Sequence, residues 1–301
     1  MIAAQAPVRL RPSIPQRIVL MAVPRAAGRR LILCVLAILV GNSLALSQSG
    51  LRPELPDEEK FGRPADEFAL SYCVDPRDPG WEMDNAIGQA IADRLLLEAR
   101  PHIVADTSQR AEIDDLYRHL LADCRIYFGF KLIPGAYPDW LTVTRPYYET
   151  GYVFVGPASA PSRLADIPAH EPIGSTLGSS GDFRLVQYNN SLPADRRWKR
   201  FPFGSDASAM EAVVDGTVTA ALVWAPAFAQ SRKSDSAIGA LKVIASEPLN
   251  IPAMQVGAVL LSEDTFLRSN VDKAIEAIVA DGTVEKILKD QGMPGTPPRS
   301  Q

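Results

Sequence analysis

The chain has 301 residues, of which 47% are hydrophobic and 22% are charged. This is the composition of a globular protein that can bury a core, and it excludes an intrinsically disordered chain. The length is enough for one large or two small domains, and the lack of a 20–50-residue repeat argues against a solenoid.

The first 47 residues have the composition of an export signal. They contain six arginines and no acidic residue, and residues 31–41 form a short apolar run that small polar residues follow. These features are typical of a secretory signal peptide, because a free-standing membrane span takes about 20 apolar residues. We therefore predict a signal peptide over residues 1–47, cleaved after Ala45 or Ser47, and a periplasmic protein.

Other interpretations of this segment stay open. It could act as an uncleaved anchor, and Arg29-Arg30 could direct twin-arginine export. A start at Met21 would give a more usual signal length. Cys34 lies at the beginning of the apolar run and not at its end, which argues against a lipoprotein anchor.

The predicted mature chain is acidic. Subtracting the six signal arginines from the formal net charge of −4 leaves −10, so bulk charge will not bind nucleic acid. Cys34 leaves with the signal, and Cys73 and Cys124 remain. In an oxidising compartment two cysteines favour one disulfide, and two buried thiols on neighbouring strands are the alternative.

After a proline-rich, acidic lead-in at residues 48–66, strands alternate with helices. The apolar spacing of Ile87, Ile91 and Leu95 predicts a helix. Such alternation implies a parallel sheet. The predicted elements of this part are a strand at 68–74, a helix at 84–99, a strand at 102–105, a helix at 110–121 and a strand at 124–130.

A second unit of the same kind follows Gly156-Pro157. We expect 152–155 to be the last strand of the first lobe, Ser205 or Asp206 to cap a helix, and Asp281-Gly282 to kink or divide the last helical segment. The other predicted elements are strands at 218–223, 241–245 and 253–261 and the helical segment at 270–291.

The two units predict an α/β protein with two lobes and a cleft at two crossings, since hinges are expected at such element ends. One crossing would be Gly156-Pro157 and the other residues 248–252. The first lobe would comprise residues 67–155 together with 253–301, which include the C-terminal tail. The second lobe would comprise residues 156–252.

The order of these segments, over residues 67–294, resembles the type II periplasmic solute-binding proteins of the family-3 class. That class includes amino-acid receptors of ABC importers. The resemblance rests on "YCVDP", "DLYRHLLADCRIYFGF", "TRPYYETGYVFV", "IGSTLGSSG", "AMEAVVDGTVTAALVW" and "IVADGTVEKILKDQGMP" in that order. It implies a two-lobed α/β fold with two hinge crossings, in which Cys73 and Cys124 lie on neighbouring strands.

A narrower resemblance rests on "RPYYETGYVFV", "ALVWAPAFA" and the positions of the two cysteines. These are similar to the periplasmic J-type accessory proteins associated with PQQ-dependent methanol and alcohol dehydrogenases. Those proteins keep the solute-binding fold but are thought to serve the dehydrogenase. The resemblance implies a quinoprotein dehydrogenase as partner, with PQQ involved only through that enzyme.

Two departures from the amino-acid receptors bear on the ligand. Tyr137 stands where those receptors carry an arginine that grips the ligand carboxylate. Trp224, followed by Ala225-Pro226, stands where they carry an acidic residue for the ligand ammonium. The sequence therefore disfavours an amino-acid ligand. The alternative to the accessory role is an importer receptor, with a permease as partner, for another small solute.

The resemblance places a set of candidate residues at the cleft. Arg145 could hold an anion or be structural, and Tyr147 and Tyr148 alternate, so one of them at most faces the cleft. Trp224 could form a wall or pack in the core. The predicted cleft residues are Asp75, Trp81, Tyr137, Arg145, Tyr147, Gly178, Ser179, Ser180 and Trp224.

The Gly/Ser loop at 177–182 offers N–H groups at a helix start, which suits an anion, although such loops often only turn the chain. An aspartate that closes a strand, as Asp75 does in the prediction, more often forms a turn than binds a ligand.

Enzyme signatures are absent from the sequence. His102, His119 and His170 are scattered and lack metal-ligand spacing, and no nucleophile elbow or cofactor loop occurs. We predict a protein that is not an enzyme, with no metal site.

Overall fold

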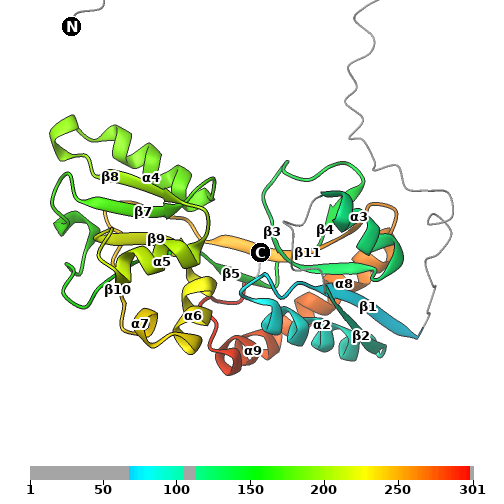
Figure 1. Ribbon diagram of the computed structural model, residues 1–301. Helices are drawn as coiled ribbons and strands as arrows, with labels where there is room; N and C mark the ends of the chain where they lie inside the picture. Colours follow the sequence, from blue (N-terminus) through cyan, green and yellow to red (C-terminus); the bar gives the residue numbers. More distant parts are fainter. Residues whose placement is uncertain (1–67, 105–112, 299–301) are drawn as a thin grey trace, which may run out of the picture. The chain divides into compact units, whose positions relative to one another are not determined.

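A computed structural model describes residues 68–104 and 113–298. The predicted signal peptide and lead-in, residues 1–47 and 48–66, lie outside the described residues. Among the helices of the described part, none is long and apolar enough to cross a membrane. These residues form two mixed β-sheets with helices on their faces, and both sheets belong to the same compact unit (Figure 1).

The first sheet is built from five strands that precede Gly151 and from β11, which the chain forms after the second sheet. Its strands β1 and β3 lie parallel to their neighbours β2 and β1, whereas β11 is antiparallel to β3, β4 and β5. Its order is β2 (Glu98–Ile103), β1 (Ala69–Val74), β3 (Ile126–Lys131), β11 (Met254–Leu261) and β4 (Leu141–Val143), with β5 (Tyr148–Thr150) also pairing with β11.

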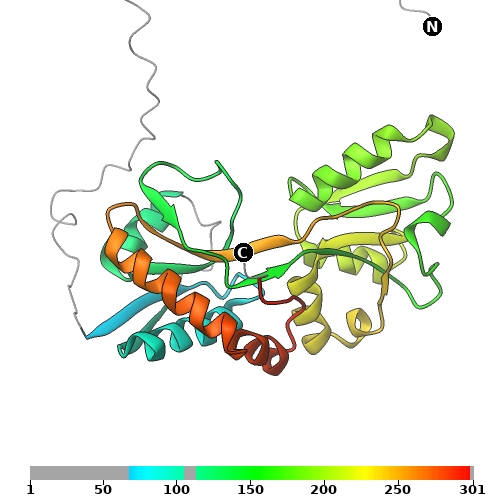
Figure 2. The ribbon, with the colours of Figure 1, turned by 180° about the vertical axis from the view of Figure 1, so that it is seen from behind.

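Side chains that alternate along β1 enter two different cores. Tyr72 and Val74 pack in the core that contains α2 and α8, whereas Cys73 packs in the core that contains α3. Figure 2 shows α8 and α9, orange to red, running along the same face of the sheet. The helices of this sheet are α2 (Trp81–Leu95), α3 (Ile113–Ala122), α8 (Thr265–Ala280) and α9 (Thr283–Gln291).

The second sheet is built from the middle of the chain. Strand β7 is parallel to β8 and β9, and β6 is antiparallel to β9 and β10. Its order is β10 (Lys242–Ile244), β6 (Tyr152–Gly156), β9 (Ala220–Trp224), β7 (Pro172–Thr176) and β8 (Lys199–Phe203). Its helices are α4 (Ser180–Ser191), α5 (Asp206–Val214), α6 (Ala225–Ser234), α7 (Ser236–Gly239) and the short turns η2 (Leu164–Asp166) and η3 (Ala194–Arg196).

The assignment of residues 152–155 to the first lobe is wrong. Strand β6 pairs with β9 and β10 in the second sheet, so the chain has already left the first sheet at Gly151. Its apolar run fits an inner strand that is covered on both faces. The two crossings also lie side by side, since Thr150 is paired with Met254 where β11 begins (Figure 1).

Two local predictions are confirmed, whereas some bounds are shifted: the strand predicted at 102–105 is Glu98–Ile103. The Ser205 hydroxyl caps α5 by accepting the Ser208 N–H at 3.1 Å. Gly282, at φ +81°, divides the last helical segment into α8 and α9. The first helix ends at Leu95, four residues earlier than predicted, because Leu96 turns into the left-handed region and the chain enters β2 at once.

The structure contains a disulfide, which was one of the two alternatives that the sequence allowed for Cys73 and Cys124. Cys73 in β1 is bonded to Cys124, just before β3, with an S–S distance of 2.00 Å and a Cα–Cα distance of 5.6 Å. Both cysteines are buried in the core beneath α3.

Candidate functional site

A cavity of about 370 Å³ lies where the chain crosses between the two sheets. It is lined by residues 132–134 after β3, Tyr152 of β6, Ser180 and Arg184 of α4, and residues 251–255 at the return to β11. We call this cavity the crossing cleft. Its volume falls within the range of small-molecule pockets, about 300–1,000 Å³.

The lining of the crossing cleft is mainly apolar. Arg184 is the charged side chain of its lining, it is exposed, and within the described residues it has no hydrogen bond or ion pair. Gln255 is already engaged, because its amide donates to the Glu149 carboxylate at 3.1 Å. The cleft therefore offers one cation and no carboxylate, an arrangement that suits an anionic or apolar group and not an ammonium.

A cation–aromatic contact joins the two sheets beside the cleft. Lys131, the last residue of β3, places its Nζ 4.0 Å from the Trp224 ring and 5.6 Å from the Tyr152 ring, whose centroid lies 5.0 Å from that of Trp224. Contacts of this kind are attractive within about 6 Å. Trp224 is thereby buried, with 4% of its surface exposed, and Tyr152 lines the cleft in its place.

The anion site predicted at the Gly/Ser loop, residues 177–182, is occupied by a carboxylate of the chain, that of Asp182. Ser179 caps α4 by accepting the Asp182 N–H at 3.0 Å, and the Asp182 carboxylate accepts the Gly178 N–H at 3.2 Å. Arg200 donates two hydrogen bonds of 2.7 Å to the same carboxylate, and Ser175 donates a third.

Burial opposes the ionisation of Asp182, but the hydrogen bonds from Arg200, Ser175 and Gly178 outweigh it and keep the pKa of this carboxyl below its ordinary value. An internal carboxylate thus takes the place that we expected for an external anion. Of residues 178–180, Ser180 alone lines the crossing cleft.

Arg145 and Tyr137 lie outside the cleft lining. The guanidinium of Arg145 pairs with Glu276, and its backbone N–H donates to Asp272 at 2.7 Å, so α8 holds this residue. The Tyr137 hydroxyl donates to the Lys131 carbonyl at 2.5 Å, and burial raises the pKa of Tyr137 to about 12.

Tyr147 is a fully buried core residue of the first sheet. Its hydroxyl donates to Asp84 at 2.6 Å and accepts the Gly129 N–H at 3.1 Å. Burial raises the pKa of the Asp84 carboxyl well above its ordinary value, and Asp78 raises it further. Trp81, the first residue of α2, is half-buried and packs against this core.

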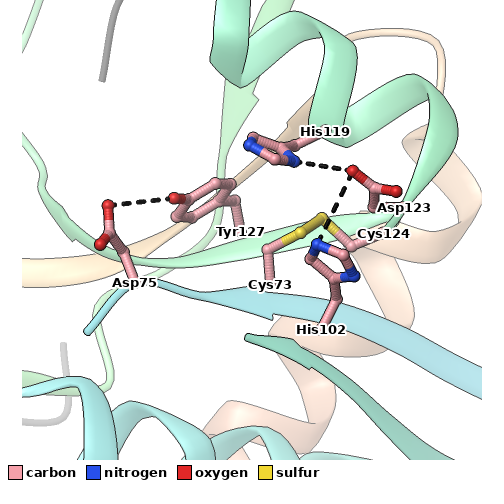
Figure 3. Close-up of a disulfide and its surroundings, with 7 residues drawn as sticks. All are labelled: Cys73, Asp75, His102, His119, Asp123, Cys124 and Tyr127. Carbon is pink, nitrogen blue, oxygen red and sulfur yellow. Dashed lines mark hydrogen bonds and ion pairs between the residues drawn. A yellow bond between two sulfur atoms is a disulfide. The ribbon is translucent and has the colours of Figure 1, made fainter. Parts of the chain in front are cut away.

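Asp75 directly follows β1. Its carboxylate forms an ion pair of 2.6 Å with Arg77. The same carboxylate accepts the Tyr127 hydroxyl at 3.3 Å (Figure 3). His102 and His119 have no metal-ligand spacing in the sequence, as predicted, but the fold brings both close to Asp123 (Figure 3).

The residues that sequence reasoning missed have recognisable signals. Arg184 lies four positions after Ser180, one helical turn from the Gly/Ser loop, and so shares its face of α4. Lys131 closes the strand that was predicted at 124–130. Tyr152 was assigned to the wrong lobe, which hid its place at the crossing.

Comparison with known proteins bears on the fold. The chain matches no protein-family model and no curated protein sequence. Many solved structures match, and they include the second substrate-binding domain assigned to an amino-acid ABC transporter from Streptococcus pneumoniae. That domain has a TM-score of 0.58 and 13% identity, over 75% of this chain and all of the domain.

Two further matches are similar in extent. MxaJ from Methlophaga aminisulfidivorans has a TM-score of 0.50 and 20% identity, over 75% of this chain and all of MxaJ. An ancestral arginine-binding protein bound to glutamine has a TM-score of 0.51 and 17% identity, over 74% of this chain and 97% of that protein. From the two sheets and these matches, the chain has the fold of the type II periplasmic solute-binding proteins.

Proposed function

We propose that this protein is a periplasmic accessory factor of a PQQ-dependent (quinoprotein) dehydrogenase and that its crossing cleft holds a segment of that enzyme. PQQ would be bound by the partner and not by this chain. The sequence resemblance to the J-type accessory proteins supports this role, and MxaJ is among the solved structures that share the fold.

The observation that carries the proposal is the chemistry of the crossing cleft. An amino-acid receptor needs an arginine and an acid that converge on the ligand, but Tyr137 is bonded to a backbone carbonyl and Trp224 is buried under Lys131. Arg184, the charged side chain of the lining, can pair with a carboxylate, but the lining contains no acidic residue to pair with an ammonium.

Exposed apolar side chains near the cleft favour a protein partner over a small solute. Ile133 in the lining is 41% exposed, and Leu177 and Phe183, which flank the loop and α4 residues of the lining, are 61% and 67% exposed. Apolar groups gathered on a surface often mark a protein contact. A partner segment with apolar side chains and one acidic residue opposite Arg184 would suit these groups.

The second candidate function is that of an importer receptor for a small solute that is not an amino acid. Its support is the cleft volume, about 370 Å³, and the substrate-binding proteins among the matched structures. A monocarboxylate with an apolar body would fit one arginine in an apolar lining. Such a receptor would need an ABC permease as partner.

Affinity capture from periplasmic extract tests the proposal. The bait is the mature protein, compared with Arg184→Glu and with Lys199→Glu as matched control. Lys199 is also exposed, and it lies at the opposite end of the parallel strands β7 and β8 from the loop at 178–180.

The wild-type and Lys199→Glu proteins should capture a PQQ dehydrogenase, and Arg184→Glu should lose most of it, because the reversed charge repels the partner's acidic residue. Capture of importer subunits alone, together with micromolar binding of a small carboxylate in calorimetry, would reject the accessory role in favour of the receptor.

A further inference from the structure

Three potential metal ligands meet on the α3 side of the first sheet, away from the lining of the crossing cleft. His102 comes from β2, His119 from α3, and Asp123 from the residues that follow α3 (Figure 3). One donor atom from each lies within 4.8 Å of the other two. The group is accessible, since the three side chains are 39%, 24% and 35% exposed.

The distances among the donors suit a tetrahedral ion. Asp123 Oδ2 lies 2.7 Å from His119 Nδ1 and 3.8 Å from His102 Nε2. Zinc bonds of about 2.0–2.1 Å place tetrahedral ligands roughly 3.4 Å apart. The two distances lie on either side of that value, so small side-chain rotations would bring the donors onto one ion.

The disulfide fixes the positions of His102 and Asp123 relative to each other. Cys73 is paired with His102 in the register of β1 and β2, and Cys124 directly follows Asp123 in the chain. The S–S bond therefore ties the position opposite His102 to the neighbour of Asp123. His119 lies four residues before Asp123, which places both on one side of the helix end.

We propose that His102, His119 and Asp123 form a binding site for a divalent transition metal, Zn²⁺ or Cu²⁺. Imidazole donors select these ions, whereas Ca²⁺ and Mg²⁺ prefer sites made of oxygen ligands. Three protein ligands leave a fourth position for water or for a group of another molecule. The site is independent of the crossing cleft and of any dehydrogenase.

Calorimetry on the mature, chelator-treated protein tests the site. Titration with ZnCl₂ and with CuCl₂ should each give one ion per chain, and CaCl₂ should give none. His102→Ala and Asp123→Asn should each weaken Zn²⁺ binding at least about tenfold, because even the loss of a group that only orients a ligand costs 10–100-fold. The control is His170→Asn, which removes an exposed histidine outside the cluster and keeps a residue that tolerates its φ of +68°.

Electron paramagnetic resonance of the Cu²⁺ form gives a second readout that a fold defect would not imitate. The wild-type signal should show coupling to two nitrogens and the His102→Ala signal to one, with circular dichroism showing the same fold for both. The proposal is overturned if neither Zn²⁺ nor Cu²⁺ binds at one per chain, if Ca²⁺ binds equally well, or if His102→Ala and Asp123→Asn bind as the wild type does.

Discussion

Removing the disulfide should destabilise the protein by about 4 kcal/mol. The double variant Cys73→Ala/Cys124→Ala opens a loop that is closed across a sequence separation of 51 residues. In the chain-entropy relation a loop of that size restricts the unfolded state by about 14 cal/mol/K, which is about 4 kcal/mol at 25 °C. Both cysteines are buried in the α3 core, so the small voids left by alanine add to this loss and do not offset it.

Urea unfolding followed by circular dichroism measures the effect. With a slope of about 2–3 kcal/mol/M, the midpoint of the double variant should lie about 1.3–2 M below that of the wild type. Reduction of the wild type with a phosphine should lower its midpoint by most of this amount, since the two thiols leave no voids. The reductant should leave the midpoint of the double variant unchanged. A midpoint shift below about 0.5 M, or a variant that still responds to the reductant, would refute this reasoning.

Three further stability predictions follow from buried contacts. Because burial raises the pKa of Asp84, the folded state keeps this proton above pH 4 while the unfolded state releases it. Wild-type urea midpoints should therefore fall as pH rises from 5 to 8, and those of Asp84→Asn should fall less; equal slopes would contradict this. Gly181→Ala places a Cβ 2.7 Å from the Tyr152 ring and should cost about 1–3 kcal/mol in urea unfolding, so an unchanged midpoint would show that the ring moves freely. Arg200→Ala leaves the Asp182 carboxylate without its two-bond partner and should cost about 3–5 kcal/mol at pH 7. The loss should become smaller as the pH falls below the ordinary carboxyl range, because the stability that comes from the lowered pKa of Asp182 is lost there; a loss that does not change with pH would refute the ion-pair origin.

Local patterns were sufficient to predict the class of fold. The alternation of strands and helices gave two α/β units, and the signals at Ser205 and Gly282 gave a helix cap and a helix division that the structure contains. The run at 152–155 was recognised as a strand but assigned to the wrong sheet. An apolar run indicates that both faces of its strand are buried, but it does not indicate which strands pair with it.

The candidate site was harder to predict because its contacts join distant residues. Arg145 is held by Asp272 and Glu276, more than 120 positions later in the chain, and nothing local distinguishes that arrangement from a residue at a cleft. His102 and His119 lie on a strand and a helix, so their spacing follows no metal motif, although the fold brings their rings to 5.8 Å between centroids. The sequence does contain the helical spacing of Ser180 and Arg184, which would have placed Arg184 at the crossing.

The accessory role is tested most directly by alcohol oxidation in a strain from which this protein has been deleted. We predict that PQQ-dependent alcohol dehydrogenase activity in periplasmic extract is lost in that strain. The wild type and Lys199→Glu should restore it, whereas Arg184→Glu, exported to the same level, should not. Full dehydrogenase activity in the deletion strain, or full restoration by Arg184→Glu, would contradict the account.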